Sequence, residues 1–181
     1  MATAILKELA NEGKHTVGSL NTIQAKTLAH GAKVAEAAVD NWTLIELAEF
    51  DDEGTRLCKA LSAKDKPAYL VATPEQRYLG EDIGHFYNDV DEMIRPVVLE
   101  SYYTRFEASN FTLNTGVTEV EKGQVAHYDV ATKKYIISDK ATPHADFAAS
   151  TFQFEVVGDL SDTAGNFLQP TVRLMCIKTG Y

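Results

Sequence analysis

The sequence predicts a mainly β protein, built as a small antiparallel β-barrel or sandwich with a short N-terminal helix or an extended arm. Three observations favour this fold class. From residue 42 onward, short apolar runs of strand length alternate with turn-forming residues. Several runs alternate apolar and polar residues with the period of two that a half-buried strand requires. The chain has 181 residues, of which 45% are hydrophobic, so it can bury a core without a disulfide or a structural metal.

Residues 1–20 are expected to form an N-terminal arm. The segment 2–11 is rich in helix formers, and Ile5, Leu6 and Leu9 are spaced to share one face. A helix of this length is marginal in water, so the segment must dock on something to persist. We therefore expect these three side chains to dock either on a partner or on the chain's own β domain.

The β domain is expected to span residues 21–181, after a polar linker over 14–21. Residues 22–39 are compatible with a helix or with a loop that leads into a sheet, and 75–92 predict a long surface loop or a short helix. The domain could be one barrel or two lobes that divide near residues 110–116. The predicted strand-forming runs are 42–50, 55–61, 68–73, 93–99, 102–113, 125–130, 135–138, 151–157 and 172–178.

Two features of these runs predict core positions. Phe152, Phe154 and Val156 alternate with polar residues and therefore share one face of a strand. Cys58 and Cys176 lie in strand-like runs and show no CxxC or Cys/His spacing. We expect both to be reduced, buried core residues.

Charge and hydropathy exclude several classes of partner. The net charge is −9, and residues 41–110 alone carry 14 acidic and 7 basic residues. A chain this acidic has no electrostatic reason to bind a phosphate backbone, so nucleic acid is not an expected partner. No apolar run approaches the roughly 18 residues of a membrane span, and residues 1–9 lack the basic start and apolar run that are typical of a signal peptide. Synthesis in a cytoplasm is expected.

The sequence carries no familiar catalytic or cofactor signature, so we expect no enzyme activity, no catalytic residues and no cofactor. His144 with Asp146, and His85 near Asp89 and Asp91, could contribute to a metal site because imidazole and carboxylate groups bind zinc. The five histidines, His15, His30, His85, His127 and His144, are scattered, and no second histidine lies three or four residues from any of them. We therefore expect solvent-facing loop histidines and no metal.

Two further groups of residues could form binding sites. The acidic residues between 81 and 92 lack the alternating spacing of a calcium loop, so a solvated surface is expected. Exposed tyrosines could instead form a sugar platform, although aromatic residues beside strands usually pack in a core. The candidate tyrosines are Tyr78, Tyr87, Tyr102 and Tyr103.

Residues 120–129, VEKGQVAHYD, together with TKKY at 132–135, resemble a segment of the head decoration (cement) proteins of tailed bacteriophages. In that family a glycine-led strand, a turn and a lysine-tyrosine return form part of a small β-barrel. The resemblance implies a non-enzymatic capsid accessory on the virion surface that binds the major capsid protein, often as a homotrimer. The alternative is a carbohydrate- or ligand-binding β-module of a phage tail or receptor-contact component.

Overall fold

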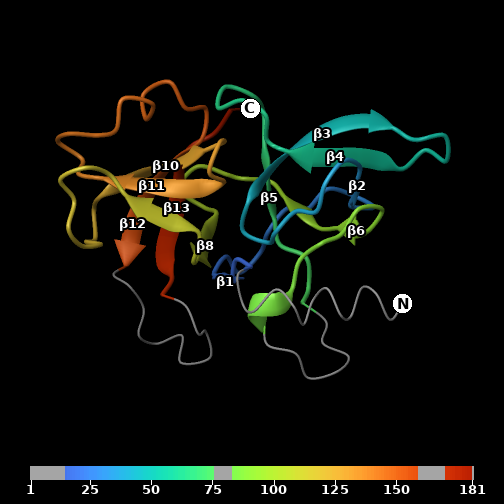
Figure 1. Ribbon diagram of the computed structural model, residues 1–181, viewed down its shortest axis with the longest axis horizontal. Coiled ribbons are helices and arrows are strands. Elements are labelled where there is room, and N and C mark those ends of the chain that lie inside the picture. The colour runs from blue at the N-terminus through green and yellow to red at the C-terminus, as the bar shows by residue number, and fades with distance from the viewer. Residues whose placement is uncertain (1–14, 76–82, 159–169, 181) are drawn as a thin grey trace.

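The computed structural model describes residues 15–75, 83–158 and 170–180 (Figure 1). Over these residues the chain forms thirteen strands and one short 3-10 helix, η1 (Ile83–His85), and it contains no α-helix. The predicted mainly β fold is therefore confirmed. The helix expected over residues 2–11 lies outside the described residues. No helix in the described segments is long and apolar enough to cross a membrane.

Seven strands form sheet A, on the left of Figure 1, in the order β1-β8-β13-β12-β10-β11-β9. Neighbouring strands are antiparallel except for β9, which runs parallel to β11. The strands of sheet A are β1 (Gly18–Leu20), β8 (Arg105–Ala108), β9 (Phe111–Leu113), β10 (Val125–Asp129), β11 (Lys134–Ser138), β12 (Gln153–Gly158) and β13 (Val172–Lys178).

Six strands form sheet B, on the right of Figure 1, in the order β6-β2-β4-β3-β5-β7. They are β2 (Ala32–Val34), β3 (Leu44–Phe50), β4 (Arg56–Ala60), β5 (Tyr69–Val71), β6 (Met93–Ile94) and β7 (Pro96–Val97). The two edge strands β6 and β7 follow each other in the chain with one residue between them. Because β6 pairs with β2 and β7 pairs with β5, this segment closes sheet B into a nearly complete barrel.

One hydrophobic core joins the two sheets. It combines Leu44 and Leu70 of sheet B with Phe106, Tyr135 and Phe154 of sheet A, among others. The three aromatic rings lie with centroids 5.3 to 5.7 Å apart in tilted and edge-to-face arrangements, the geometry that aromatic pairs prefer. A second, smaller core fills the interior of sheet B.

The core positions predicted from the sequence are confirmed. Phe152, Phe154 and Val156 are all buried, as the alternation of this run indicated. Cys58 and Cys176 are buried and reduced, and burial raises the pKa of each thiol to about 12. Both thiols are therefore protonated at neutral pH.

The linker expected over residues 14–21 is wrong in its described part. Residues Gly18–Leu20 form β1, which pairs with Ala108 to Phe106 of β8, and Val17 is buried. Gly18 permits this pairing because it has no side chain: a Cβ there would lie 2.1 Å from the carbonyl oxygen of Glu107. The ambiguous segment 22–39 resolves into a loop that contains the short strand β2.

Candidate functional site

The histidine cluster of this protein consists of His127, His144 and Asp146. His127 lies on β10, whereas His144 and Asp146 lie on the loop 139–152 that joins β11 to β12. One potential ligand atom from each residue lies within 4.8 Å of the other two. The rings of His127 and His144 stack with centroids 4.9 Å apart and planes inclined by 26°.

His127 is buried because the loop 139–152 covers its face of sheet A. It lies on β10, between β11 and β12, and Ala126 and Tyr128 on either side of it belong to the core on the other face. The rings of His144 and Phe147, both from the loop, pack against the His127 ring. The His127 side chain is 1% exposed. The expectation of solvent-facing loop histidines is therefore wrong for His127.

Hydrogen bonds within the loop fix its path over β10. Gln153 donates from Nε2 to the carbonyl oxygen of Phe147 at 2.8 Å, and the ring of Phe147 meets the His127 ring edge-on. The backbone N–H of Asp146 donates to Nδ1 of His144 at 3.2 Å. These contacts hold His144 and Asp146 of the loop next to β10.

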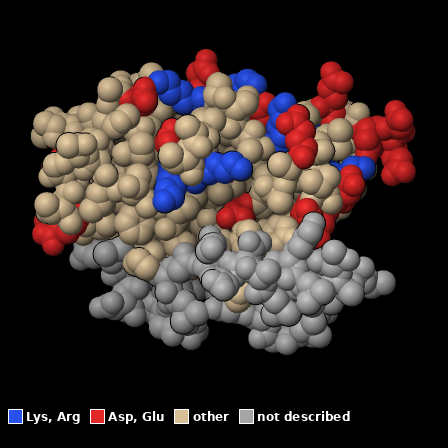
Figure 2. Space-filling view, in the orientation of Figure 1, with Lys and Arg blue, Asp and Glu red and all other residues tan. Residues whose placement is uncertain are grey.

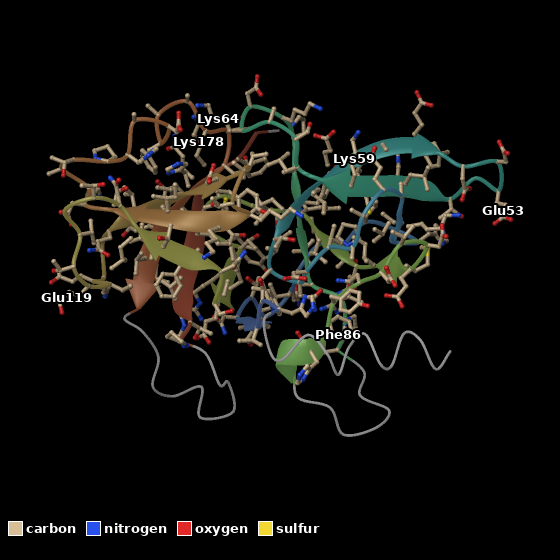
Figure 3. All side chains as sticks on the ribbon, in the orientation of Figure 1. Glu53, Lys59, Lys64, Phe86, Glu119 and Lys178 are labelled. Atoms are coloured by element: carbon tan, nitrogen blue, oxygen red, sulfur yellow. The ribbon has the colours of Figure 1, made fainter. Side chains whose placement is uncertain are left out.

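Two lysines bind the same loop from other parts of the chain (Figure 3). Lys64, which follows β4, forms an ion pair with Oδ1 of Asp146, and its carbonyl oxygen accepts a 2.9 Å hydrogen bond from the N–H of Thr151. Lys178 on β13 donates from Nζ to the carbonyl oxygen of Ser150 at 3.2 Å. The loop is thereby attached to both sheets.

The electrostatics of the cluster follow from burial and from Lys64. The hydrogen bond and charge of Lys64 hold the pKa of Asp146 below its usual range, so this carboxylate is ionised at neutral pH. Burial, and then the neighbouring His144, lowers the pKa of His127 to about 4. Its imidazole is therefore neutral at pH 7.

An open pocket of about 610 Å³ adjoins the cluster and includes His127, Asp146, Lys64 and Asp129 in its lining. Nδ1 of His127 is buried and has no hydrogen-bond partner among the residues that the structure describes. Two imidazoles and one carboxylate beside a pocket form a donor set that zinc uses in proteins. The arrangement can hold a divalent ion with one coordination position open to a water or a ligand.

Sequence reasoning selected His144 and Asp146 but missed His127 and Lys64. His127 is 17 positions from His144 in the sequence, and only the antiparallel return of the chain through β11 brings them together. The other histidine considered, His85, forms no such group with Asp89 and Asp91 in the described segments. The backbone N–H of Asp89 instead donates a local 2.8 Å hydrogen bond to Oε2 of Glu92.

A second feature is the tyrosine turn, residues Glu100–Tyr103, between β7 and β8. Tyr102 and Tyr103 are 73% and 47% exposed. Tyr102 has a φ of 58°, a left-handed conformation that is rare for a bulky residue. The turn is fixed on sheet A because the N–H of Tyr102 donates to the carbonyl oxygen of Cys176 at 2.7 Å.

The segment that contains Ile23 runs beside the tyrosine turn. Oγ1 of Thr22 accepts a 2.7 Å hydrogen bond from the N–H of Arg105, and the N–H of Val98 donates to the carbonyl oxygen of Lys26 at 2.8 Å. Ile23, between these two contacts, is 99% exposed. This region therefore presents one aliphatic and two aromatic side chains to solvent.

The remaining predicted residues are distributed as follows. Ile5, Leu6 and Leu9, the predicted docking residues, lie outside the described residues, as do Tyr78, Glu81 and Asp82. Tyr87 stacks on His15 with ring centroids 4.8 Å apart. In Figure 2, acidic side chains gather at the end of sheet B where the β3–β4 turn projects, and that turn contains Asp51, Asp52 and Glu53.

Comparison with known proteins identifies the origin of the chain. It is 52% identical over 178 residues to the SPbeta prophage-derived protein YonC of Bacillus subtilis (strain 168), and the match covers 98% of this chain and 99% of that relative. No solved structure matches the chain. A family described as YonC prophage protein matches residues 11–177. The chain is therefore phage-derived and belongs to the YonC prophage protein family.

Proposed function

We propose that this protein is a non-enzymatic structural component of the virion that binds the assembled head shell through the major capsid protein. The observation that carries the proposal is the tyrosine turn, which exposes two aromatic rings on a backbone fixed in an unfavourable conformation. The phage origin of the family and the resemblance of residues 120–135 to head decoration proteins support the same role.

The conformation of Tyr102 favours a role in binding. A left-handed φ costs a residue with a side chain on the order of 1 kcal/mol, and such strain concentrates at functional sites. Tyrosine is also enriched in protein–protein interfaces, because its ring supplies a large contact area and its hydroxyl can still bond to water or a partner. A rigid, exposed pair of tyrosines suits docking on a protein surface.

The N-terminal arm supplies the second contact in this proposal. Ile5, Leu6 and Leu9 form the apolar face that the sequence predicts there. A segment that orders on a partner can cover a large surface. On a symmetric shell, an oligomer such as a trimer would add avidity to each weak contact without any new interface.

The experiment begins with purified particles of the phage that encodes this chain. Mass spectrometry should find this protein in the particles at a copy number comparable to that of the major capsid protein. The purified protein should also co-sediment with heads assembled from that capsid protein, and its oligomeric mass should be measured separately. Absence from the particles together with no co-sedimentation would refute the proposal.

A glycan array separates the proposal from the alternative of a carbohydrate-binding tail module. The decoration role predicts no saccharide binding by the purified full chain. Saccharide binding that is lost when Tyr102 and Tyr103 are replaced by serine would favour the tail module and count against head decoration. The control is Phe50→Ser, because Phe50 is an exposed aromatic residue on sheet B, away from the turn.

A further inference from the structure

We propose that His127, His144 and Asp146 form a binding site for one divalent transition-metal ion of the zinc type. The inference is independent of the virion role, since it rests only on the geometry of this cluster. A bound ion would connect the loop 139–152 to β10 by coordination bonds. The ion would therefore stabilise the packing of this loop on sheet A. One coordination position would stay open to the adjoining pocket.

The distances are close to those that a metal site needs. Two nitrogen or oxygen ligands of a tetrahedral zinc ion lie about 3.3 Å apart, given bond lengths of about 2.0 Å. The ligand atoms here lie within 4.8 Å of one another. His127 is fixed on a strand, whereas both other ligands are on one loop, so a small movement of the loop or its side chains closes the site.

The unpartnered nitrogen of His127 is the second, independent observation. Buried polar groups in proteins are almost always hydrogen-bonded, and an exception calls for an explanation such as an ion that binds there. Nδ1 of His127 is such an exception within the part of the chain that the structure describes. Its side chain also lines the pocket beside the cluster. A metal ion would use the lone pair that no protein group uses.

Lys64 and the metal would share the Asp146 carboxylate. Oδ1 of Asp146 is paired with Nζ of Lys64, while Oδ2 lies 3.9 Å from Nδ1 of His144. Metal ligands are commonly oriented by an outer partner of this kind. Lys64 therefore holds one carboxylate oxygen and leaves the other beside His144.

The donor set decides which ions the site would bind. Calcium and magnesium prefer sites made of oxygen ligands, whereas imidazole suits zinc, cobalt, nickel and copper. Two imidazoles with a single carboxylate therefore favour the second group. Cys58 and Cys176 are buried, and neither belongs to a group of three potential metal ligands among the residues that the structure describes.

The test uses the purified full chain after removal of metals by chelation and dialysis. Titration with zinc chloride by calorimetry, and with cobalt(II) by visible absorption, should show one ion per chain. Zinc should raise the thermal midpoint, because binding to the folded state stabilises it. Calcium and magnesium should show no binding at the same concentrations.

Matched variants locate the ion. His144→Ala and Asp146→Asn should each weaken zinc binding at least tenfold and remove the zinc-dependent rise in the thermal midpoint. His30→Asn is the control, since His30 is an exposed histidine in a left-handed turn that asparagine tolerates. Circular dichroism of the metal-free variants verifies that they fold.

Three outcomes would overturn the proposal. The first is no zinc or cobalt binding by the folded wild-type chain. The second is wild-type affinity retained in folded His144→Ala and Asp146→Asn. The third is binding of calcium as tight as that of zinc, which would contradict a site built from imidazoles.

Discussion

The phenolic hydroxyl of Tyr135 donates a buried 2.9 Å hydrogen bond to the carbonyl oxygen of Trp42, 93 positions earlier in the chain. Tyr135 lies on β11 of sheet A, and Trp42 lies two residues before the start of β3 of sheet B. The N–H of Trp42 in turn donates to the carbonyl oxygen of Val71 on β5 at 2.8 Å. This short series of polar contacts crosses the core and fixes one sheet against the other.

Tyr135→Phe removes this bond and keeps the ring in the aromatic cluster. Within the described segments, the carbonyl oxygen of Trp42 then retains the 3.5 Å contact with Asn110 Nδ2 as its one remaining hydrogen bond. We expect the free energy of unfolding to fall by about 1–2 kcal/mol, because a buried acceptor loses its close donor. Urea denaturation measures this change. Tyr103→Phe, at an exposed position, should change it by less than about 0.5 kcal/mol, and equal losses in both variants would contradict this role.

Much of the strand content could be predicted because local patterns encode it. The run 172–178 matches β13 at both ends, and buried and half-buried residues alternate over 172–177. The turn after Asp129 is likewise local, since its carboxylate accepts hydrogen bonds from the N–H groups of Ala131 and Thr132. Such elements are specified by residues within a few positions of one another.

Other elements could not be predicted because distant residues specify them. β1 is only three residues long and has no strand-like alternation, and it pairs with β8 where Gly18 fits closely against Glu107. The histidine cluster likewise requires the register of β10 with β12, which places His127 opposite Gln153. No spacing within the sequence reveals a contact that sheet register creates.

Gly18→Ala tests whether β1 depends on this close approach. A Cβ at position 18 would lie 2.1 Å from the carbonyl oxygen of Glu107 and 2.9 Å from the ring of Trp42. We expect a loss of about 1–3 kcal/mol in the free energy of unfolding, the usual range for overpacking. Thermal denaturation measures it. In the control Gly158→Ala, the new Cβ would meet Arg173 at 3.7 Å, so a loss as large there would contradict the steric explanation.

Glu46 on β3 should make the stability depend on pH in the acid range. Its carboxylate accepts hydrogen bonds from the N–H and Oγ of Ser62 at 3.2 and 2.7 Å and from Nζ of Lys66 at 3.0 Å. Burial alone would raise the pKa of Glu46, but these bonds together lower it below 4.5, its ordinary value. The stabilisation is therefore complete above pH 4.5 and is lost as the pH falls through the lower pKa of the folded state.

Glu46→Gln should remove this pH dependence. At pH 7 we expect the free energy of unfolding to fall by about 1–3 kcal/mol, because charge-assisted hydrogen bonds are lost. Below pH 4.5 the difference from the wild type should shrink. Urea denaturation at several pH values measures both effects. The control is Glu49→Gln, an exposed position on the same strand, and a difference between Glu46→Gln and wild type that stays constant with pH would contradict the linkage.

Deletion of residues 2–12 tests the predicted docking role of Ile5, Leu6 and Leu9. If the arm binds the shell, the deletion should reduce co-sedimentation with assembled heads at least tenfold. The triple change of these three residues to serine should have the same effect, while the full-length chain is retained. Unchanged occupancy in both variants would remove the arm from the docking surface. An unchanged thermal midpoint would verify that the β domain remains folded.

Tyr102→Gly separates docking from stability at the tyrosine turn. Glycine adopts the φ of 58° without steric cost. The strain that this removes from the folded state offsets the larger conformational entropy that glycine gives the unfolded chain. We therefore expect the free energy of unfolding to rise or to stay within about 1 kcal/mol of wild type, while binding to heads falls at least tenfold.

Lys133→Gly is the matched control, because Lys133 is exposed with a φ of 56° but lies in the β10–β11 turn. Its stability should change in the same way and its binding should not. A marked loss of stability in Tyr102→Gly would contradict the strain explanation, and undiminished binding would exclude the turn from the interface.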